Sequence, residues 1–423
     1  MRNSSPDKPS LDVLTTLDGR LIAASRGIRL LSSLSWPASA QQAFLAQWQR
    51  GNAVLPEIRY AAMDFSDVRA SLSKIAREAP SDHPVGDYIR RTAQSWIVAA
   101  QLLEAAGSER MLDLSVRLYG RPGDQVPGAE LTNLDAARHF IRLADDFADG
   151  IVINEADYCI PASVLQQELQ QQLDAFFGTE VVRVETDPEL ISKAAAGATR
   201  LRLRSATCFT EDDRRQLFEH EALVHSLTAL NGRAQPNLAS LGQTSPRITA
   251  TQEGLAVFAE LITGSIDILR MKRISLRIIA IDLALSGADF IEVFRFFLDA
   301  GQTEAESFAS AQRVFRGAPL TGGAAFTKDT VYLHGLLSVH TFFRSALKSG
   351  RLKLIHNLFA GKLALQDVVA LEPFFDSGYI VQPRWMPLWA RRVNGLAGVL
   401  AFSLFANQIR LDRVALDNLT LGL

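Results

Sequence analysis

The feature that most constrains this chain is an H-E-x-x-x-H string from His220 to His225, followed further along by Glu253. Two imidazoles and a carboxylate can hold one zinc ion with a coordination position left open. Glu221 follows the first histidine directly, where a general base for an attacking water would lie. We therefore expect His220, His225 and Glu253 to bind one Zn²⁺ ion, and Glu221 to be catalytic in the hydrolysis of amide bonds.

The gap between the two histidines restricts the geometry of the helix that carries them. On an ideal α-helix, His225 would lie roughly 140° around the axis from His220, too far to share a metal ion. A local π-type widening brings positions i and i+5 onto one face, and such bulges are frequent at functional sites. The sequence therefore predicts an over-wide helix between these histidines. The alternative interpretation is a surface His-Glu pair followed by a core histidine.

The limits of this helix can also be predicted. Thr210 and Asp213 have the spacing of a capping box, which favours a helix that begins there. Apolar residues then recur at helical spacing, and Asn231-Gly232 is expected to end the helix. The ligand pair thus falls on a well-delimited helix.

The third ligand has a rival. Thr251 can cap a helix that carries Glu253, and Glu260 follows on nearly the same face. Glu260 could therefore replace Glu253 as a ligand, or orient a ligand histidine from behind.

Two strands are expected before the metal helix, at residues 180–184 and 200–205. In the second, leucines alternate with Arg200, Arg202 and Arg204, which is the period of a half-buried strand. Such a strand could pair with an extended substrate, and outward arginines would then favour acidic peptides. The pattern favours the alternative, a solvated charged face.

Length and composition predict two domains or one large one. Apolar residues at helical spacing, with the two expected strands between them, predict a predominantly helical α+β fold. We expect a disordered head at residues 1–10, with no signal peptide or lipidation site, and a helical N-terminal region at 11–165. A zincin-like catalytic domain with a small sheet should occupy residues 166–423.

Charge and hydropathy exclude two classes of partner. A net charge of −2 gives no electrostatic footprint for nucleic acid. The uncharged run at residues 393–409 is too short and too polar to span a membrane, and we interpret it as a buried C-terminal helix. Cys159 and Cys208 are interpreted as reduced thiols of a cytoplasmic protein, with a single disulfide as the alternative.

Several motifs carry a family resemblance. The run from Phe218 to Pro236 and the T-Q-E-G-L-A stretch from Thr251 to Ala256 resemble bacterial QEGLA-motif proteins, described as modulators of flavohaemoglobin expression. The likeness spans roughly residues 195–390 and includes 313–317 and 326–333. More remotely, the motifs are similar to the microtubule-associated tyrosine carboxypeptidases of animals. That resemblance implies zinc ligands at His220, His225 and Glu253, with Glu221 as the catalytic base.

A second segment is expected to complete the cleft. Arg313, Arg316 and Lys328 are cations set among glycines, and a carboxypeptidase needs a fixed cation for the terminal carboxylate of its substrate. Tyr332 is a candidate catalytic donor to the oxyanion. In the alternative, Lys328 faces solvent and Tyr332 belongs to the core.

Together these features predict a zinc-dependent metallo-exopeptidase, of carboxypeptidase type, that acts on a peptide or protein C-terminus, acidic if the arginines face the cleft. Two alternatives stay open. One is a metal-binding regulatory protein without turnover. The other is a zinc aminopeptidase or dipeptidyl peptidase, with Glu260 or Asp329 as the anchor for a substrate amine.

Overall fold

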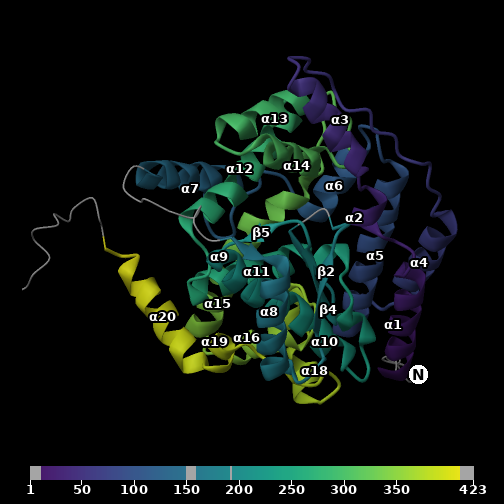
Figure 1. The fold of residues 1–423 in the computed structure, drawn as a ribbon. Coiled ribbons are helices and arrows are strands. Elements are labelled where there is room, and N and C mark those ends of the chain that lie inside the picture. The colour runs from purple at the N-terminus through teal and green to yellow at the C-terminus, as the bar shows by residue number, and fades with distance from the viewer. Residues whose placement is uncertain (1–10, 149–158, 191–192, 410–423) are drawn as a thin grey trace, which may run out of the picture.

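The protein is predominantly helical, with a small amount of sheet near the middle of the chain (Figure 1). The structure is a computed structural model and describes residues 11–148, 159–190 and 193–409. The predicted head at residues 1–10 lies outside these ranges. The prediction of a mainly helical fold with small sheets is confirmed.

Helices α1, α2, α4 and α6 pack around the long helix α5, which begins at Pro84. Proline suits this first helical position because the N–H there has no helical partner to lose. Helix α4 packs against α5 and α1, and α7 packs against α12 of the C-terminal half. The bounds are α1 (Leu11–Ser25), α2 (Leu30–Ser33), α3 (Ala38–Trp48), α4 (Ser66–Glu78), α5 (Pro84–Glu104), α6 (Met111–Tyr119) and α7 (Asn133–Ala148).

Two small sheets precede the metal-ligand helix. Strands β1 (Ile160–Pro161) and β5 (Cys208–Phe209) form an antiparallel pair, with α8 (Ala162–Phe177) following β1. In the larger sheet the order is β2-β4-β3, with β2 parallel and β3 antiparallel to the central strand. These strands are β2 (Arg183–Asp187), β3 (Ala194–Ala196) and β4 (Arg200–Arg204).

The larger sheet differs in part from the sequence prediction. The first strand begins at Arg183 rather than 180, because Gly178 (φ 102°) and Glu180 (φ 59°) have positive φ and form a turn. The second strand lies at residues 200–204, where predicted, but it is central. The edge on its other side is β3, which the sequence analysis missed. A substrate therefore cannot pair with β4 itself.

The arginines of β4 form a solvated charged face. Arg200 and Arg202 are exposed, whereas the alternating leucines are buried. Arg202 Nη1 lies 3.0 Å from Asp187 Oδ2, and Arg200 Nη1 lies 3.9 Å from Glu185 Oε2, both on β2. These pairs favour the solvated-face interpretation over a role in substrate selection.

The prediction of two reduced cysteines is wrong. Cys159, directly before β1, and Cys208 in β5 form a disulfide. Strand pairing brings together two residues that are 49 positions apart, and this pairing could not be anticipated from their spacing. Since disulfides persist mainly in oxidising compartments, the prediction of a cytoplasmic location loses the support it drew from these residues.

The C-terminal half consists of helices that surround the metal-ligand segment. Helix α11 packs against α15, and α13 packs against α14 beside α3. The longer helices are α11 (Thr249–Thr263), α12 (Ile268–Leu285), α13 (Phe290–Asp299), α14 (Glu304–Phe315), α15 (Thr330–Lys348) and α20 (Val393–Ala406). The shorter helices are α9 (Glu211–Gln216), α10 (Leu227–Arg233), α16 (Lys353–Asn357), α17 (Leu365–Ala370), α18 (Glu372–Asp376) and α19 (Leu388–Arg391). The π- and 3₁₀-segments are η2 (Leu217–Ser226), η3 (Ala239–Gly242), η4 (Pro246–Ile248), η5 (Thr327–Asp329) and η6 (Leu358–Ala360).

One hydrophobic core joins the two halves, with members from Leu14 to Leu400. A second cluster gathers the aromatic side chains of α13 and α14 against Trp36 and Phe44, so Phe290, Phe294 and Phe297 belong to the core. The shared core surrounds the metal-ligand helix. The proposed division near residue 165 stays a prediction.

Helix α20 is not the buried helix predicted. Leu396 and Leu400 are buried, but Val399, Phe402 and Phe405 are 53%, 73% and 67% exposed. The helix extends away from the rest of the molecule (Figure 1). The apolar composition of α20 therefore did not predict how much of the helix is buried. Within the described residues, no helix has both the length and the apolar character needed to cross a membrane.

Candidate metal centre

The helix that carries the two histidines begins as predicted. Thr210 accepts a hydrogen bond from the backbone N–H of Asp213, whose side chain accepts one from the backbone N–H of Thr210. Helix α9 follows and passes directly into the π-helix η2. The prediction of an over-wide turn between His220 and His225 is confirmed, because η2 covers both. The wider turn places positions i and i+5 on one face.

The end of this helix lies beyond the predicted stop. Helix α10 continues to Arg233, so Asn231-Gly232 does not terminate it. The Asn231 side chain instead donates to the backbone oxygens of Phe359 and Trp385, both at 2.8 Å. A Cβ at Gly232 would lie 2.0 Å from the backbone oxygen of Leu241. These two residues therefore anchor neighbouring loops against the helix.

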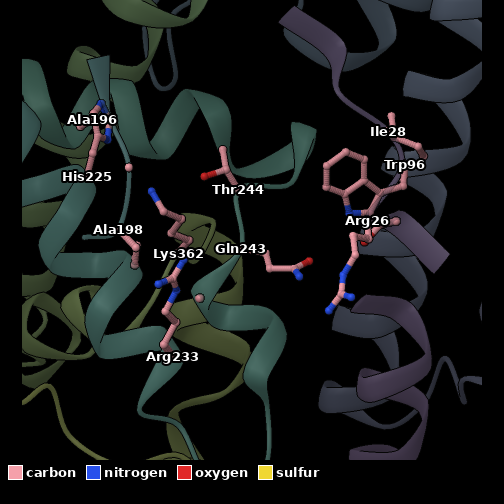
Figure 2. A pocket seen from close by; sticks show the side chains of 14 residues that line it. Arg26, Ile28, Trp96, Ala196, Ala198, His225, Arg233, Gln243, Thr244 and Lys362 are labelled. Carbon is pink, nitrogen blue, oxygen red and sulfur yellow. The ribbon is translucent and has the colours of Figure 1, made fainter. Parts of the chain in front are cut away.

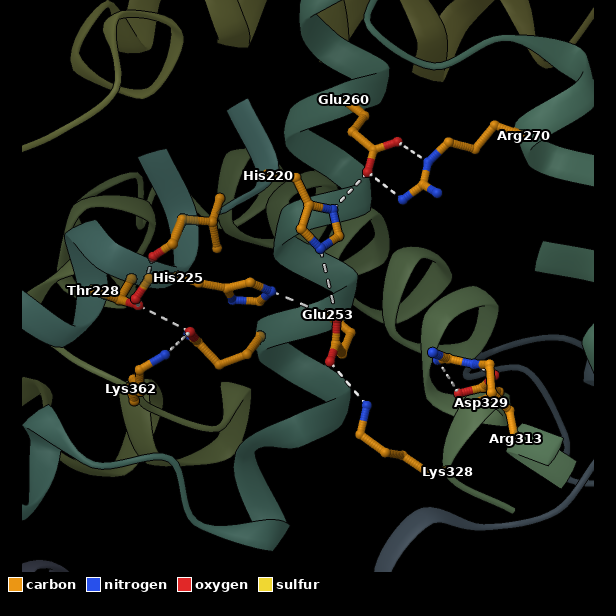
Figure 3. Close-up of polar contacts among 12 residues, drawn as sticks. His220, His225, Thr228, Glu253, Glu260, Arg270, Arg313, Lys328, Asp329 and Lys362 are labelled. Atoms are coloured by element: carbon orange, nitrogen blue, oxygen red, sulfur yellow. Dashed lines mark hydrogen bonds and ion pairs between the residues drawn. The ribbon is translucent and has the colours of Figure 1, made fainter. Parts of the chain in front are cut away.

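Helix α11 brings the third predicted ligand to the histidines. Glu253 Oε2 lies 3.7 Å from His220 Nε2 and 3.6 Å from His225 Nε2 (Figure 3). The prediction that Thr251 caps this helix is wrong, because the helix begins at Thr249, directly after η4. The Thr251 hydroxyl instead accepts from the backbone N–H of Leu365.

The geometry of these three side chains fits a small cation. Their ligand atoms all lie within 4.8 Å of one another. In a tetrahedral zinc site, bonds of about 2.0–2.1 Å place neighbouring ligand atoms about 3.3 Å apart. The observed separations of 3.6 and 3.7 Å are close to that value and too long for strong hydrogen bonds. His220, His225 and Glu253 could therefore hold a divalent metal ion between them.

The Glu260 carboxylate contacts the imidazole of His220. Its Oε1 lies 2.6 Å from His220 Nδ1, on the ring edge opposite the Nε2 that faces Glu253. Arg270 donates two further hydrogen bonds to the Glu260 carboxylate, at 2.5 and 2.8 Å. A carboxylate that accepts from Nδ1 fixes the tautomer in which Nε2 is free to bind a metal. This arrangement favours the orienting role for Glu260 over that of a rival ligand.

The charge state of the centre is set by these contacts. Burial opposes ionisation of His220, yet the neighbouring carboxylates of Glu253 and Glu260 raise its pKa to about 10. Burial likewise opposes ionisation of Glu253, but Lys328 and the two imidazoles hold its pKa well below the usual value. A cation in this position competes with the proton for the same imidazole nitrogen. The ionised Glu253 and its neighbours therefore favour a positive charge at this position.

Glu221 lies beside the metal centre, and its carboxylate is not bonded to another side chain of the described structure. It is half-buried, and it has no hydrogen bond or ion pair among the described residues. Its negative charge nevertheless acts on His220, Lys362 and Arg270, which places it near these three side chains. A carboxylate in this position is free to accept a proton.

Two of the three cations predicted to bind substrate already have carboxylate partners. Lys328 Nζ lies 3.0 Å from Glu253 Oε1 and 5.2 Å from the centre of the Tyr332 ring. Arg313 donates two hydrogen bonds to Asp329, at 2.6 and 2.7 Å. The Nε of Arg316 is buried without a hydrogen-bond partner in the described structure. Thus Lys328 joins the metal centre and Arg313 joins Asp329.

Tyr332 lies on α15 among these cations. Asp329 and Tyr332 raise the pKa of Arg313 against the effect of burial. Arg277, which the sequence analysis missed, lies 3.8 Å from Asp329, and burial together with Arg313 lowers its pKa to about 10. Tyr332 is half-buried and is therefore neither fully core nor freely exposed.

A cavity of about 340 Å³ opens beside His225 (Figure 2). Lys362 and Arg233 line it together with His225, and Trp96 and Arg26 form the facing wall. Of these residues, only His225 was predicted from the sequence as part of the site. Lys362 belongs to no recognisable motif, and it lies 137 positions beyond His225 in the chain (362 − 225).

The fold and the centre define a class: a helical protein with a His-His-Glu centre, built across a π-helix and α11, that could hold a metal ion. The model of the microtubule-associated tyrosine carboxypeptidase family matches residues 42–408. The chain therefore belongs to this family. A search of curated proteins finds no match. The likeness to QEGLA-motif proteins stays a prediction.

Proposed function

We propose that this protein is a zinc-dependent carboxypeptidase that removes a residue from the C-terminus of a peptide or protein. The observation that carries the proposal is the approach of His220 Nε2 and His225 Nε2 to one oxygen of Glu253, at 3.7 and 3.6 Å. Membership of the tyrosine carboxypeptidase family supports the choice of reaction. In this proposal residues 166–423 form the zincin-like catalytic part and residues 11–165 its helical support.

The donor set suits the chemistry. A bound zinc ion would supply Lewis acidity, which lowers the pKa of water and polarises a carbonyl. Glu221 takes the proton of the attacking water and delivers it to the leaving amine. Glu260 and Lys328 hold His220 and Glu253 in position through their contacts of 2.6 and 3.0 Å. Tyr332 is the candidate donor to the oxyanion.

The aminopeptidase alternative needs a free acidic anchor for a substrate amine. Both candidates are occupied: Glu260 by Arg270 and His220, and Asp329 by Arg313. Releasing either would leave a buried guanidinium without its carboxylate, which is costly. The structure thus favours a carboxypeptidase. The regulatory alternative predicts stoichiometric zinc without any product.

The test is release of a terminal residue from an N-acetylated peptide that ends in tyrosine. Zinc-loaded protein should release free tyrosine from this peptide. It should not cleave the same peptide when the C-terminus is amidated. Glu221→Gln should retain the metal and lose at least about 100-fold in kcat, the range expected for a general base. Undiminished turnover in Glu221→Gln would remove this residue as the base. Zinc binding without product from the wild-type protein would favour the regulatory alternative.

A further inference from the structure

We propose that Lys362 and Arg233 bind the α-carboxylate of the substrate's C-terminal residue, in the cavity that His225 also lines. This inference rests on the proposed carboxypeptidase function. It moves the carboxylate anchor away from Arg313, Arg316 and Lys328 to the opposite side of the metal centre.

The predicted anchors are poorly suited to a second carboxylate. Arg313 already donates two hydrogen bonds to Asp329, and Lys328 bonds Glu253 at 3.0 Å. A substrate carboxylate would have to displace an internal one from either residue. Arg316 is not among the residues that line the cavity beside His225. A carboxylate anchor within this cavity must therefore come from other residues.

Lys362 has the properties of such an anchor. The residue is 6% exposed, and its Nζ donates at 3.2 Å to the neutral amide oxygen of Gln252. An ammonium group has three protons to donate, and a buried cation without a carboxylate partner is costly. Burial lowers the pKa of Lys362 to about 8, and a carboxylate bound beside it would favour its charged form. Lys362 therefore carries buried positive charge that a ligand can neutralise.

Arg233 lies on the same wall of the cavity. It is exposed and forms no ion pair with any residue in the described ranges. It follows His225 by eight residues, a rise of roughly 12 Å along an ideal helix. Side chains on a helix lean toward its N-terminus, so the Arg233 guanidinium is directed back toward His225. In Figure 2 the Lys362 amine lies between Arg233 and His225.

The shape of the cavity suits one terminal residue. Its volume of about 340 Å³ is at the low end of the range for ligand pockets, about 300–1,000 Å³. Ala196 and Ala198, at the end of edge strand β3, line one side, and Gln243 and Thr244 lie across from them. An extended C-terminus laid beside β3 would place its last residue in this cavity and its final amide bond near His225.

The experiment compares free-acid and amidated forms of the N-acetylated tyrosine-terminated peptide. In the Glu221→Gln background, calorimetry should show that the free acid binds more tightly. Adding Lys362→Met should reduce that binding roughly 10- to 100-fold and leave amide binding unchanged, because a charge-assisted hydrogen bond is lost. Lys362→Arg should restore most of the preference. If Lys362→Met does not fold, Arg233→Gln provides the same test, because Arg233 is exposed.

Three readouts separate the possible failures. Zinc content should be unchanged in every variant, and Lys348→Met, an exposed cation on α15, should be indistinguishable from the parent. If both Lys362→Met and Arg233→Gln still prefer the free acid as the parent does, the proposed anchor is wrong. It is also wrong if only Arg316→Gln loses the preference for the free acid. If the wild-type protein binds the free acid through Lys362 but never hydrolyses it, the anchor stands and the carboxypeptidase proposal fails.

Discussion

His220 Nδ1 lies 2.6 Å from Oε1 of Glu260, while Nε2 of the same ring faces Glu253 at 3.7 Å. One imidazole thus connects two carboxylates with different tasks. Glu260 is fully buried and held by Arg270, so it can orient the ring but is turned away from the centre. Glu253 faces both histidines and is the carboxylate positioned to bind a cation.

Replacing the orienting carboxylate should weaken the metal site. Glu260→Gln is expected to raise the zinc dissociation constant about 10- to 100-fold, because outer-shell partners fix the tautomer and basicity of a ligand histidine. Competition with a chromogenic chelator measures the change, and Glu109→Gln, an exposed glutamate, is the control. Unchanged zinc affinity in a folded Glu260→Gln protein would contradict the orienting role.

Lys328 should act on the metal centre rather than on the substrate. Because its Nζ bonds Glu253 Oε1 at 3.0 Å, Lys328→Met should raise the zinc dissociation constant by roughly tenfold. The preference for free-acid over amidated peptide should not change. Loss of that preference with intact zinc affinity would instead restore Lys328 as the substrate anchor.

Gly254 should tolerate no side chain. A Cβ there would lie 2.1 Å from the backbone carbon of Gly335, where α11 and α15 cross. Gly254→Ala is therefore expected to lower the free energy of unfolding by about 3 kcal/mol, at the upper end of overpacking costs. Gly19→Ala is the matched control, since nothing lies within 4 Å of its new Cβ and alanine favours an exposed helix by about 0.5–1 kcal/mol. Denaturant unfolding measures both, and equal stabilities would contradict the close helix contact.

Asp18 should make stability depend on pH. Burial raises its pKa to about 6, although hydrogen bonds from Ser240 partly oppose the shift. The folded state therefore favours the protonated carboxyl, so this contribution to stability is complete below about pH 4 and is lost as the pH rises through 6. Relative to Asp18→Asn, the wild-type free energy of unfolding should fall by about 3 kcal/mol between pH 4 and 7. A difference that does not vary with pH would exclude an Asp18 carboxyl that titrates in this range.

The local features of the site could be predicted because short-range geometry determines them. The five-residue gap between His220 and His225 requires a π-helix, and the spacing of Thr210 and Asp213 specifies the start of the helix. The seven-residue interval from Glu253 to Glu260 predicted that both carboxylates lie on one face of their helix, and both contact His220. That interval alone could not decide which nitrogen of His220 each one faces.

Features that depend on distant contacts could not be predicted. Strand β3 consists of three alanines, a residue that is depleted in strands, and it forms because β4 offers it an edge. Lys362 reaches the cavity through the packing of segments remote from His225 in sequence. Hydropathy identified α20 as apolar, but exposure depends on whether another element covers it, and Phe402 is 73% exposed.

The most direct test of the account is a crystal structure of zinc-loaded protein with data collected at the zinc absorption edge. We expect one anomalous peak at about 2.0–2.2 Å from His220 Nε2, His225 Nε2 and a Glu253 carboxylate oxygen. Glu260 should remain bonded to His220 Nδ1 and outside the coordination sphere. A peak elsewhere, or two imidazole rings that point away from each other in the loaded protein, would contradict the shared metal site.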